Sequence, residues 1–169
     1  LGLIMGSLSI GFLNTAFLKD LCLDKYGPKV ILLVMVIVWA ISMFSMAAAT
    51  GFVLLFLARV LLGLAEGPTF PALTMVTGKW LPVKERASSL GFIQTAAPIG
   101  VAISGPIVAA LIYYFSWRGM FIMLGVIAFI WIPFWLLFFR NNPKDSKYVN
   151  SKELEHINKQ RHTNKKEEE

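Results

Sequence analysis

Five long apolar segments follow one another along the chain, separated by short polar stretches. They cover about residues 1–18, 30–49, 52–78, 88–113 and 119–139. Each is long enough to cross roughly 30 Å of hydrocarbon as a helix. None alternates strictly between apolar and polar positions, and all exceed the roughly ten-residue strands of a membrane barrel. The pattern therefore predicts an all-α membrane protein with five transmembrane helices within residues 1–140, because a helix satisfies its own backbone hydrogen bonds in lipid.

The charged connections between these segments predict the orientation. Three connections are basic: the first, the third and the one after the last segment. Their Lys and Arg residues are Lys19, Lys25, Lys29, Lys79, Lys84, Arg86 and Arg140. Residues 49–51 have no charge, and the fourth connection has only Arg118. Because Lys and Arg collect on the cytoplasmic side, we expect the three basic connections in the cytoplasm and residue 1 outside. That arrangement, and the absence of an initiating Met, lead us to expect a piece of a longer protein with one more helix upstream.

Composition excludes several other classes of protein. Of the 169 residues, 56% are apolar and 15% are charged, whereas a soluble domain has about 25% charged residues. The net charge of +6 follows from membrane topology and does not indicate nucleic-acid binding. A single cysteine, Cys22, excludes an internal disulfide, and the two histidines both lie in the tail, so no metal site or cofactor is expected. No Ser/His/Asp, Cys/His or phosphate-loop pattern indicates an enzyme.

The tail from residue 141 loses its apolar character abruptly. Asn150 and Glu153 have the spacing of a capping box, which predicts a short helix carrying Leu154 and Ile157. The Lys- and Glu-rich end beyond it is expected to be disordered. We expect residues 141–169 to begin a cytoplasmic loop.

Two opposite charges lie within the third apolar segment. Arg59 and Glu66 are seven residues apart, which turns about 700° around a helix, so they share a face within about 20° and stand roughly 10 Å apart along the axis. Either charge at the bilayer centre costs roughly 3 kcal/mol or more, so both should face a bundle interior or a water-filled cavity. A functional pair and a structural pair bonded to neighbouring helices are both open. Pro68 and Pro71 follow directly and should bend the helix, although membrane helices also tolerate proline generally.

The fourth segment combines polar residues with glycines. Gln94 can reach a polar ligand or form a hydrogen bond between helices. Gly91, Gly100 and Gly105 allow another helix to approach closely. In the first segment the same two interpretations apply to Ser7, Ser9, Asn14 and Thr15.

Taken together, these residues resemble the major facilitator superfamily. Residues 24–29, Asp-Lys-Tyr-Gly-Pro-Lys, look like the second half of its motif between the second and third helices, although Asp20 stands where that motif has Gly. Arg59 and Gly63 match its fourth-helix motif. Three ordered stretches, 59–71, 79–86 and 116–121, are similar to the anion:cation symporter family, which includes carriers of sugar acids, phthalate, sialic acid and glutamate.

The resemblance implies an architecture of twelve helices in two six-helix halves that alternate access to a central cavity. The five predicted spans then match helices two to six, so the first helix and the second half lie outside this chain. The expected function is transport of a small organic anion, such as a sugar acid, together with a proton or sodium ion across a bacterial plasma membrane. An exchanger or exporter of the same superfamily and a non-transporting product of a split gene are the alternatives.

The resemblance also implies roles for individual residues. Arg59 would bind the substrate carboxylate, with Gln94 as a second polar contact, and Glu66 would be the proton-coupling acid. These roles suit a guanidinium, which forms bidentate bonds with a carboxylate, and a carboxyl group, which can carry a proton. Residues of the cytoplasmic motifs would serve gating or structure instead: Asp24, Lys25, Gly27, Lys29, Glu85 and Arg86.

Overall fold

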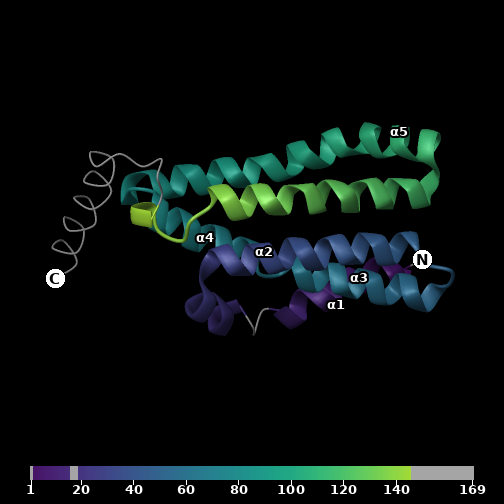
Figure 1. The fold of residues 1–169 in the computed structure, drawn as a ribbon, viewed down its shortest axis with the longest axis horizontal. Coiled ribbons are helices and arrows are strands. Elements are labelled where there is room, and N and C mark those ends of the chain that lie inside the picture. The colour runs from purple at the N-terminus through teal and green to yellow at the C-terminus, as the bar shows by residue number, and fades with distance from the viewer. Residues whose placement is uncertain (1, 16–18, 146–169) are drawn as a thin grey trace.

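The computed structural model describes residues 2–15 and 19–145 of the chain, and every regular element in that part is a helix (Figure 1). Five α-helices are followed by one 3₁₀ turn. They are α1 (Gly2–Thr15), α2 (Lys19–Ala47), α3 (Phe52–Glu66), α4 (Thr69–Trp80), α5 (Val83–Phe138) and η1 (Pro143–Asp145). The predicted all-helical class is confirmed for these residues.

Two residues with positive φ interrupt the longest helices. Gly27 in α2 has φ 74° and ψ 165°, and Pro28 follows it, so the regular part of α2 begins after this turn. Ser116 in α5 has φ 63° and ψ 168°. The chain reverses there, so α5 consists of two antiparallel arms, 83–115 and 117–138 (Figure 1).

Three stretches of the described chain are long and apolar enough to cross a membrane: Lys25–Ala47, Phe52–Trp80 and Val83–Phe138. The second comprises α3 and α4, and the third contains both arms of α5. The first predicted segment is helical over the 14 residues of α1. The membrane-protein class is therefore confirmed, while the count of five crossings remains a prediction.

Helix α3 packs against both α1 and α2. Its contact with α2 forms the core, where Met43 and Met46 meet Ala58 and Leu62. The buried Ser42 hydroxyl donates to the Ala58 carbonyl oxygen at 2.6 Å, so this buried polar side chain is satisfied.

Helices α1 and α3 cross at two glycines, Gly11 and Gly63. A Cβ atom at Gly11 would collide with the Val60 carbonyl oxygen, and one at Gly63 would collide with the Leu8 carbonyl oxygen. The two backbones are therefore in direct contact, as small residues permit in membrane helices. By contrast, no described heavy atom lies within 4 Å of the Cβ position of Gly91, Gly100 or Gly105.

The basic connections lie together at one end of the molecule (Figure 1). The start of α2, the junction of α4 with α5, and η1 are at this end, which is called the basic end below. The α2–α3 connection and the reversal at Ser116 are at the opposite end. This arrangement is the one that the charge pattern predicts; which end faces the cytoplasm remains a prediction.

Some predicted features fall outside the described residues. The capping box of Asn150 and Glu153, with Leu154 and Ile157, belongs to residues 146–169, which are not described. The side chains of Asp20 and Asp24 also lie outside the described part of the chain.

Candidate transport site

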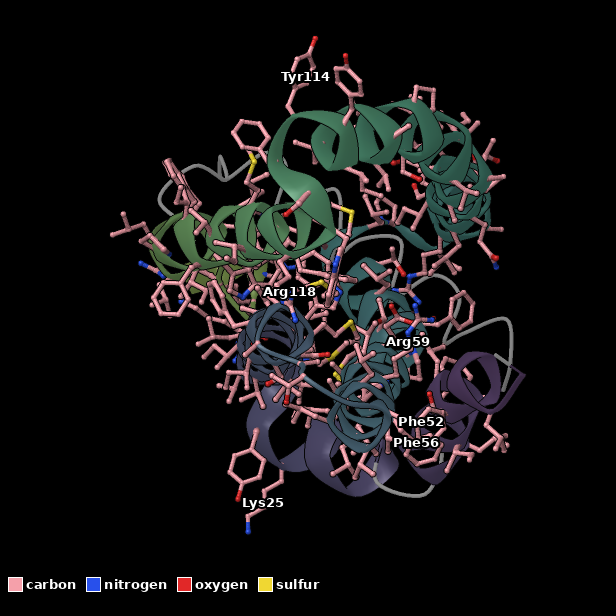
Figure 2. The ribbon with its side chains drawn as sticks, turned by 90° about the vertical axis from the view of Figure 1, so that its right-hand side faces the viewer. Lys25, Phe52, Phe56, Arg59, Tyr114 and Arg118 are labelled. Carbon is pink, nitrogen blue, oxygen red and sulfur yellow. The ribbon has the colours of Figure 1, made fainter. Side chains whose placement is uncertain are left out.

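Arg59 lies in the middle of α3, one turn before the glycine crossing with α1. Its side chain is partly buried. Among the residues whose side chains are described, none forms a hydrogen bond or an ion pair with its guanidinium. In Figure 2, Lys25 and Tyr114 extend outward, whereas Arg59 and Arg118 lie toward the middle of the end-on view. Arg59 is thus a partly buried cation within an apolar helix.

Glu66 is the last residue of α3 and lines a cavity of about 250 Å³. The cavity lies between α2, the α3–α4 junction and the second arm of α5. Its other walls are apolar or aromatic except for Thr69, and they comprise Leu32, Met35, Val36, Trp39, Ala65, Leu73, Trp131 and Trp135. Glu66 is the carboxylate of this cavity.

The regular helix is interrupted directly after Glu66, at Gly67 and Pro68, and both residues have right-handed helical backbone angles. A bend of the helix at this point remains a prediction. Pro68 and Pro71 have no N–H, so the carbonyl groups of Leu64 and Gly67 lack the helical donor four residues later. The end of α3 therefore presents polar backbone groups close to Glu66, within a segment that is otherwise apolar.

The predicted site residues are not all in one place. Helix α3 runs without a break from Arg59 to Glu66, which preserves their spacing on one helix. Arg59 does not line the cavity that contains Glu66, and neither does Gln94. Gln94 is exposed on the first arm of α5. The described part of the chain thus does not bring Arg59, Glu66 and Gln94 into one cavity.

The motif of residues 24–29 is anchored to the end of α5. The Lys29 backbone N–H donates to Asn141 Oδ1 at 2.9 Å, and the indole Nε1 of Trp135 donates to the Lys29 carbonyl oxygen at 3.1 Å. Asn141 thereby caps the helix that starts after Gly27, because it binds an amide of the first turn. Lys25 is exposed, with its Nζ 5.3 Å from the centre of the Tyr26 ring.

The motif of residues 79–86 joins α4 to α5. Arg86 Nη2 donates to the Gly78 carbonyl oxygen at 2.7 Å, and its Nε donates to the Leu81 carbonyl oxygen at 3.2 Å. The guanidinium thus satisfies carbonyl groups at the C-terminus of α4, where a positive charge is favourable. Glu85 is exposed in the first turn of α5.

A third contact closes the opposite end of the molecule. Arg118 Nη2 donates to the Ala49 carbonyl oxygen at 3.1 Å, and the guanidinium stacks on Trp117 at 4.4 Å. Arg118 therefore ties the reversal at Ser116 to the α2–α3 connection.

Comparison with known proteins identifies the family. A sequence profile of the Major Facilitator Superfamily matches residues 1–166. The chain belongs to the Major Facilitator Superfamily. This family and the names of its relatives, which are transporters, point to a membrane transport family and not to an enzyme.

Several relatives in this superfamily are named as carriers of acids. The hexuronate transporter of Bacillus subtilis is 37% identical over 146 residues, which are 86% of this chain and 35% of the relative. A probable sulfoacetate transporter of Cupriavidus necator is 31% identical over 157 residues, 93% of this chain and 36% of the relative. The galacturonate transporter of Dickeya chrysanthemi is 33% identical over 135 residues, 80% of this chain and 39% of the relative. The chain thus spans between a third and two fifths of the length of these relatives.

Proposed function

We propose that the chain is the N-terminal part of a twelve-helix transporter that carries a small organic anion, such as a sugar acid, by proton symport. Its five spans would be helices two to six, and the substrate would be carried by alternating access across a bacterial plasma membrane. The observation that carries this proposal is Arg59, a partly buried cation in the middle of an apolar helix, with no partner among the described side chains. The relatives named for hexuronate, sulfoacetate and galacturonate support an anionic substrate.

Arg59 binds the carboxylate of the substrate in this proposal. A guanidinium offers two parallel N–H donors that match the two oxygens of a carboxylate. The cost of placing a cation in the membrane is offset when the anion arrives. Gln94, from the first arm of α5, adds a neutral hydrogen bond on the opposite wall of the completed cavity.

Glu66 carries the coupling proton in this proposal. Its carboxyl group lies at the end of the helix that holds Arg59, beside a helix break and an apolar cavity. A carboxyl group in such surroundings is a typical proton carrier in membrane transporters. Protonation at Glu66 and anion binding at Arg59 would then occur on the same helix.

The basic end faces the cytoplasm in this proposal. Asp24, Lys25, Gly27 and Lys29 would form one part of the cytoplasmic gate, and Glu85 with Arg86 another. Two contacts support this assignment: Asn141 caps the helix after Gly27, and Arg86 closes the end of α4. Each motif stabilises a connection between two helices. In the proposed mechanism, these connections move as rigid units when the two six-helix halves rock against one another.

Uptake measured in the complete transporter tests the substrate site. Arg59→Lys should lose most of the affinity for labelled galacturonate, about tenfold or more, because an ammonium cannot reproduce the bidentate fork. Arg118→Lys is the matched control, since Arg118 donates one hydrogen bond that lysine can also donate. Normal affinity in the Arg59→Lys variant would refute the proposed role of Arg59.

A further inference from the structure

Two cationic side chains, Lys29 in α2 and Arg140 just after α5, converge on one carbonyl oxygen at the end of α5. Lys29 Nζ donates to the Leu136 carbonyl oxygen at 3.1 Å, and Arg140 Nη1 donates to the same oxygen at 3.0 Å. The two positive charges therefore lie close together and repel one another. Among the described side chains, no carboxylate forms an ion pair with either cation. An anion placed beside Lys29 and Arg140 would be stabilised by the two positive charges together.

Lys29 is held in position by contacts of its own backbone. Its N–H donates to Asn141 Oδ1, and its carbonyl oxygen accepts from the Trp135 indole. Gly27, two residues earlier, has a left-handed backbone, and a Cβ atom there would lie 2.9 Å from Asn141 Nδ2. The start of α2 is thus docked tightly onto the end of α5. Lys29 is therefore positioned by tertiary contacts, whereas Arg140 reaches the Leu136 carbonyl oxygen one turn earlier along the chain.

An aromatic groove of about 350 Å³ adjoins this cation pair on the second arm of α5. Trp131 and Trp135 stack at 4.8 Å between ring centres, and Trp135 and Phe139 stack at 4.0 Å. Phe134 and Phe138 complete the lining and are more than half exposed. The groove lies beside Lys29, because the indole of Trp135 lines it and also donates a hydrogen bond to the Lys29 carbonyl oxygen.

We propose that this end of α5 binds an anionic phospholipid, with the phosphate between Lys29 and Arg140 and an acyl chain in the aromatic groove. The site presents positive charge and then apolar surface along the helix, the order in which a lipid presents its headgroup and its chain. Aromatic rings favour this depth of a membrane, and basic residues between helices at the cytoplasmic face attract anionic headgroups. Arg59, Glu66 and Gln94 do not line the groove, so the lipid site is distinct from the proposed substrate site. Trp131 and Trp135 are walls of both the groove and the Glu66 cavity.

Lipid titration of the full-length protein in mild detergent, followed by native mass spectrometry, tests this site. Phosphatidylglycerol should bind more tightly than phosphatidylcholine. Lys29→Gln with Arg140→Gln should weaken phosphatidylglycerol binding by about tenfold or more, because each basic residue near the headgroup contributes. The matched control is Lys25→Gln with Lys84→Gln, which removes two exposed charges from the same end. An equal loss in both double variants, or no loss in the first, would refute the site.

Two further variants keep the test independent of folding. Asn141→Asp retains the oxygen that caps the Lys29 amide but adds a negative charge beside the cations. Its thermal stability should be unchanged while phosphatidylglycerol binding falls; unchanged binding would contradict the proposal. Phe134→Ala should weaken a long-chain phosphatidylglycerol more than a dihexanoyl one. Inorganic phosphate that competes as strongly as the lipid would assign a site for free anions and overturn the lipid proposal.

Discussion

At the scale of single residues, α3 places two charges in different surroundings. Arg59 is partly buried beside the crossing with α1, and Glu66 lines an apolar cavity beside a helix break. Each charge costs roughly 3 kcal/mol or more in the middle of a bilayer, so neither is retained without a compensating role. The different surroundings suit different tasks, anion binding for the guanidinium and proton transfer for the carboxyl group.

The role of Glu66 can be separated from that of Arg59. Glu66→Gln preserves the shape of the side chain and removes its titration. In the reconstituted full-length transporter, this variant should lose substrate accumulation driven by a pH gradient, because no proton is taken up or released at position 66. Exchange of labelled for unlabelled substrate should persist, since it needs no net proton movement.

The accumulation and exchange assays are both made on one preparation of the Glu66→Gln variant. Uphill uptake at the normal rate would exclude Glu66 from coupling. A thermal-unfolding curve that matches that of the unchanged protein must accompany the assays, so that a misfolded helix is recognised.

The pair on α3 was predictable from sequence because both residues belong to one helix, and helical periodicity alone fixes their relation. The contacts of Asn141 and Trp135 with Lys29 were not predictable in this way. Asn141 is 112 residues from Lys29 in sequence, and at the end of an apolar segment it looks like the first residue of a tail. Only the fold brings the two together.

At the scale of elements, the crossing of α1 and α3 depends on glycine. A methyl group at position 63 would meet the Leu8 carbonyl oxygen, which is backbone and cannot rotate away. Gly63→Ala should therefore destabilise the protein by about 1–3 kcal/mol, the usual cost of overpacking. Gly100→Ala is the matched control, because its Cβ position is free of described atoms and alanine favours a helix by about 1 kcal/mol.

Thermal unfolding in the same detergent compares the two glycine variants. The expected result is a lower midpoint for Gly63→Ala and an equal or higher one for Gly100→Ala. Equal unfolding midpoints for Gly63→Ala and the unchanged protein would mean that α1 and α3 can move apart without loss of stability, which would contradict the prediction.

The sequence predicted the helical segments, because length and apolar character are local properties. It did not predict which glycines are tightly packed. Gly91, Gly100 and Gly105 suggested a close neighbour, but within the described residues the tight crossing is at Gly11 and Gly63. A glycine shows only that a close approach is possible; the partner helix decides where it occurs.

The reversal in α5 is an element boundary that contains strain. Ser116 has φ 63° and ψ 168°, a region that is essentially restricted to glycine and costs other residues about 1–3 kcal/mol. Ser116→Gly should raise the unfolding midpoint, because glycine adopts this backbone freely. Ser116→Val should lower the midpoint, because a β-branched side chain fits it worst. The opposite order in thermal unfolding would contradict the backbone conformation at this position.

At the scale of the whole molecule, polar contacts join α2 to the second arm of α5 at both ends. Asn141 and Trp135 bind Lys29 at the basic end, and Arg118 binds the Ala49 carbonyl oxygen at the other. Between these ends, a Cβ atom at Gly125 would lie 2.9 Å from the Phe44 ring, so the two helices are also in close contact. Because α2 and the second arm of α5 are in contact at both ends and between them, the two helices are suited to move as one rigid body.

Orientation in the membrane is a property of the whole molecule, and two cysteine substitutions test it. Lys84 is exposed in the first turn of α5 at the basic end, and Gly51 is exposed in the α2–α3 connection at the opposite end. In a background with Cys22 replaced by Ser, Gly51→Cys should react with a membrane-impermeant thiol reagent in intact cells. Lys84→Cys should react only after the membrane is permeabilised, because the basic connections stay in the cytoplasm. Since the two positions lie at opposite ends of one bundle, only one of the two cysteines should react in intact cells. Reaction of Lys84→Cys in intact cells would invert the orientation and would move the proposed gate, and the lipid site at the same end, to the outer face.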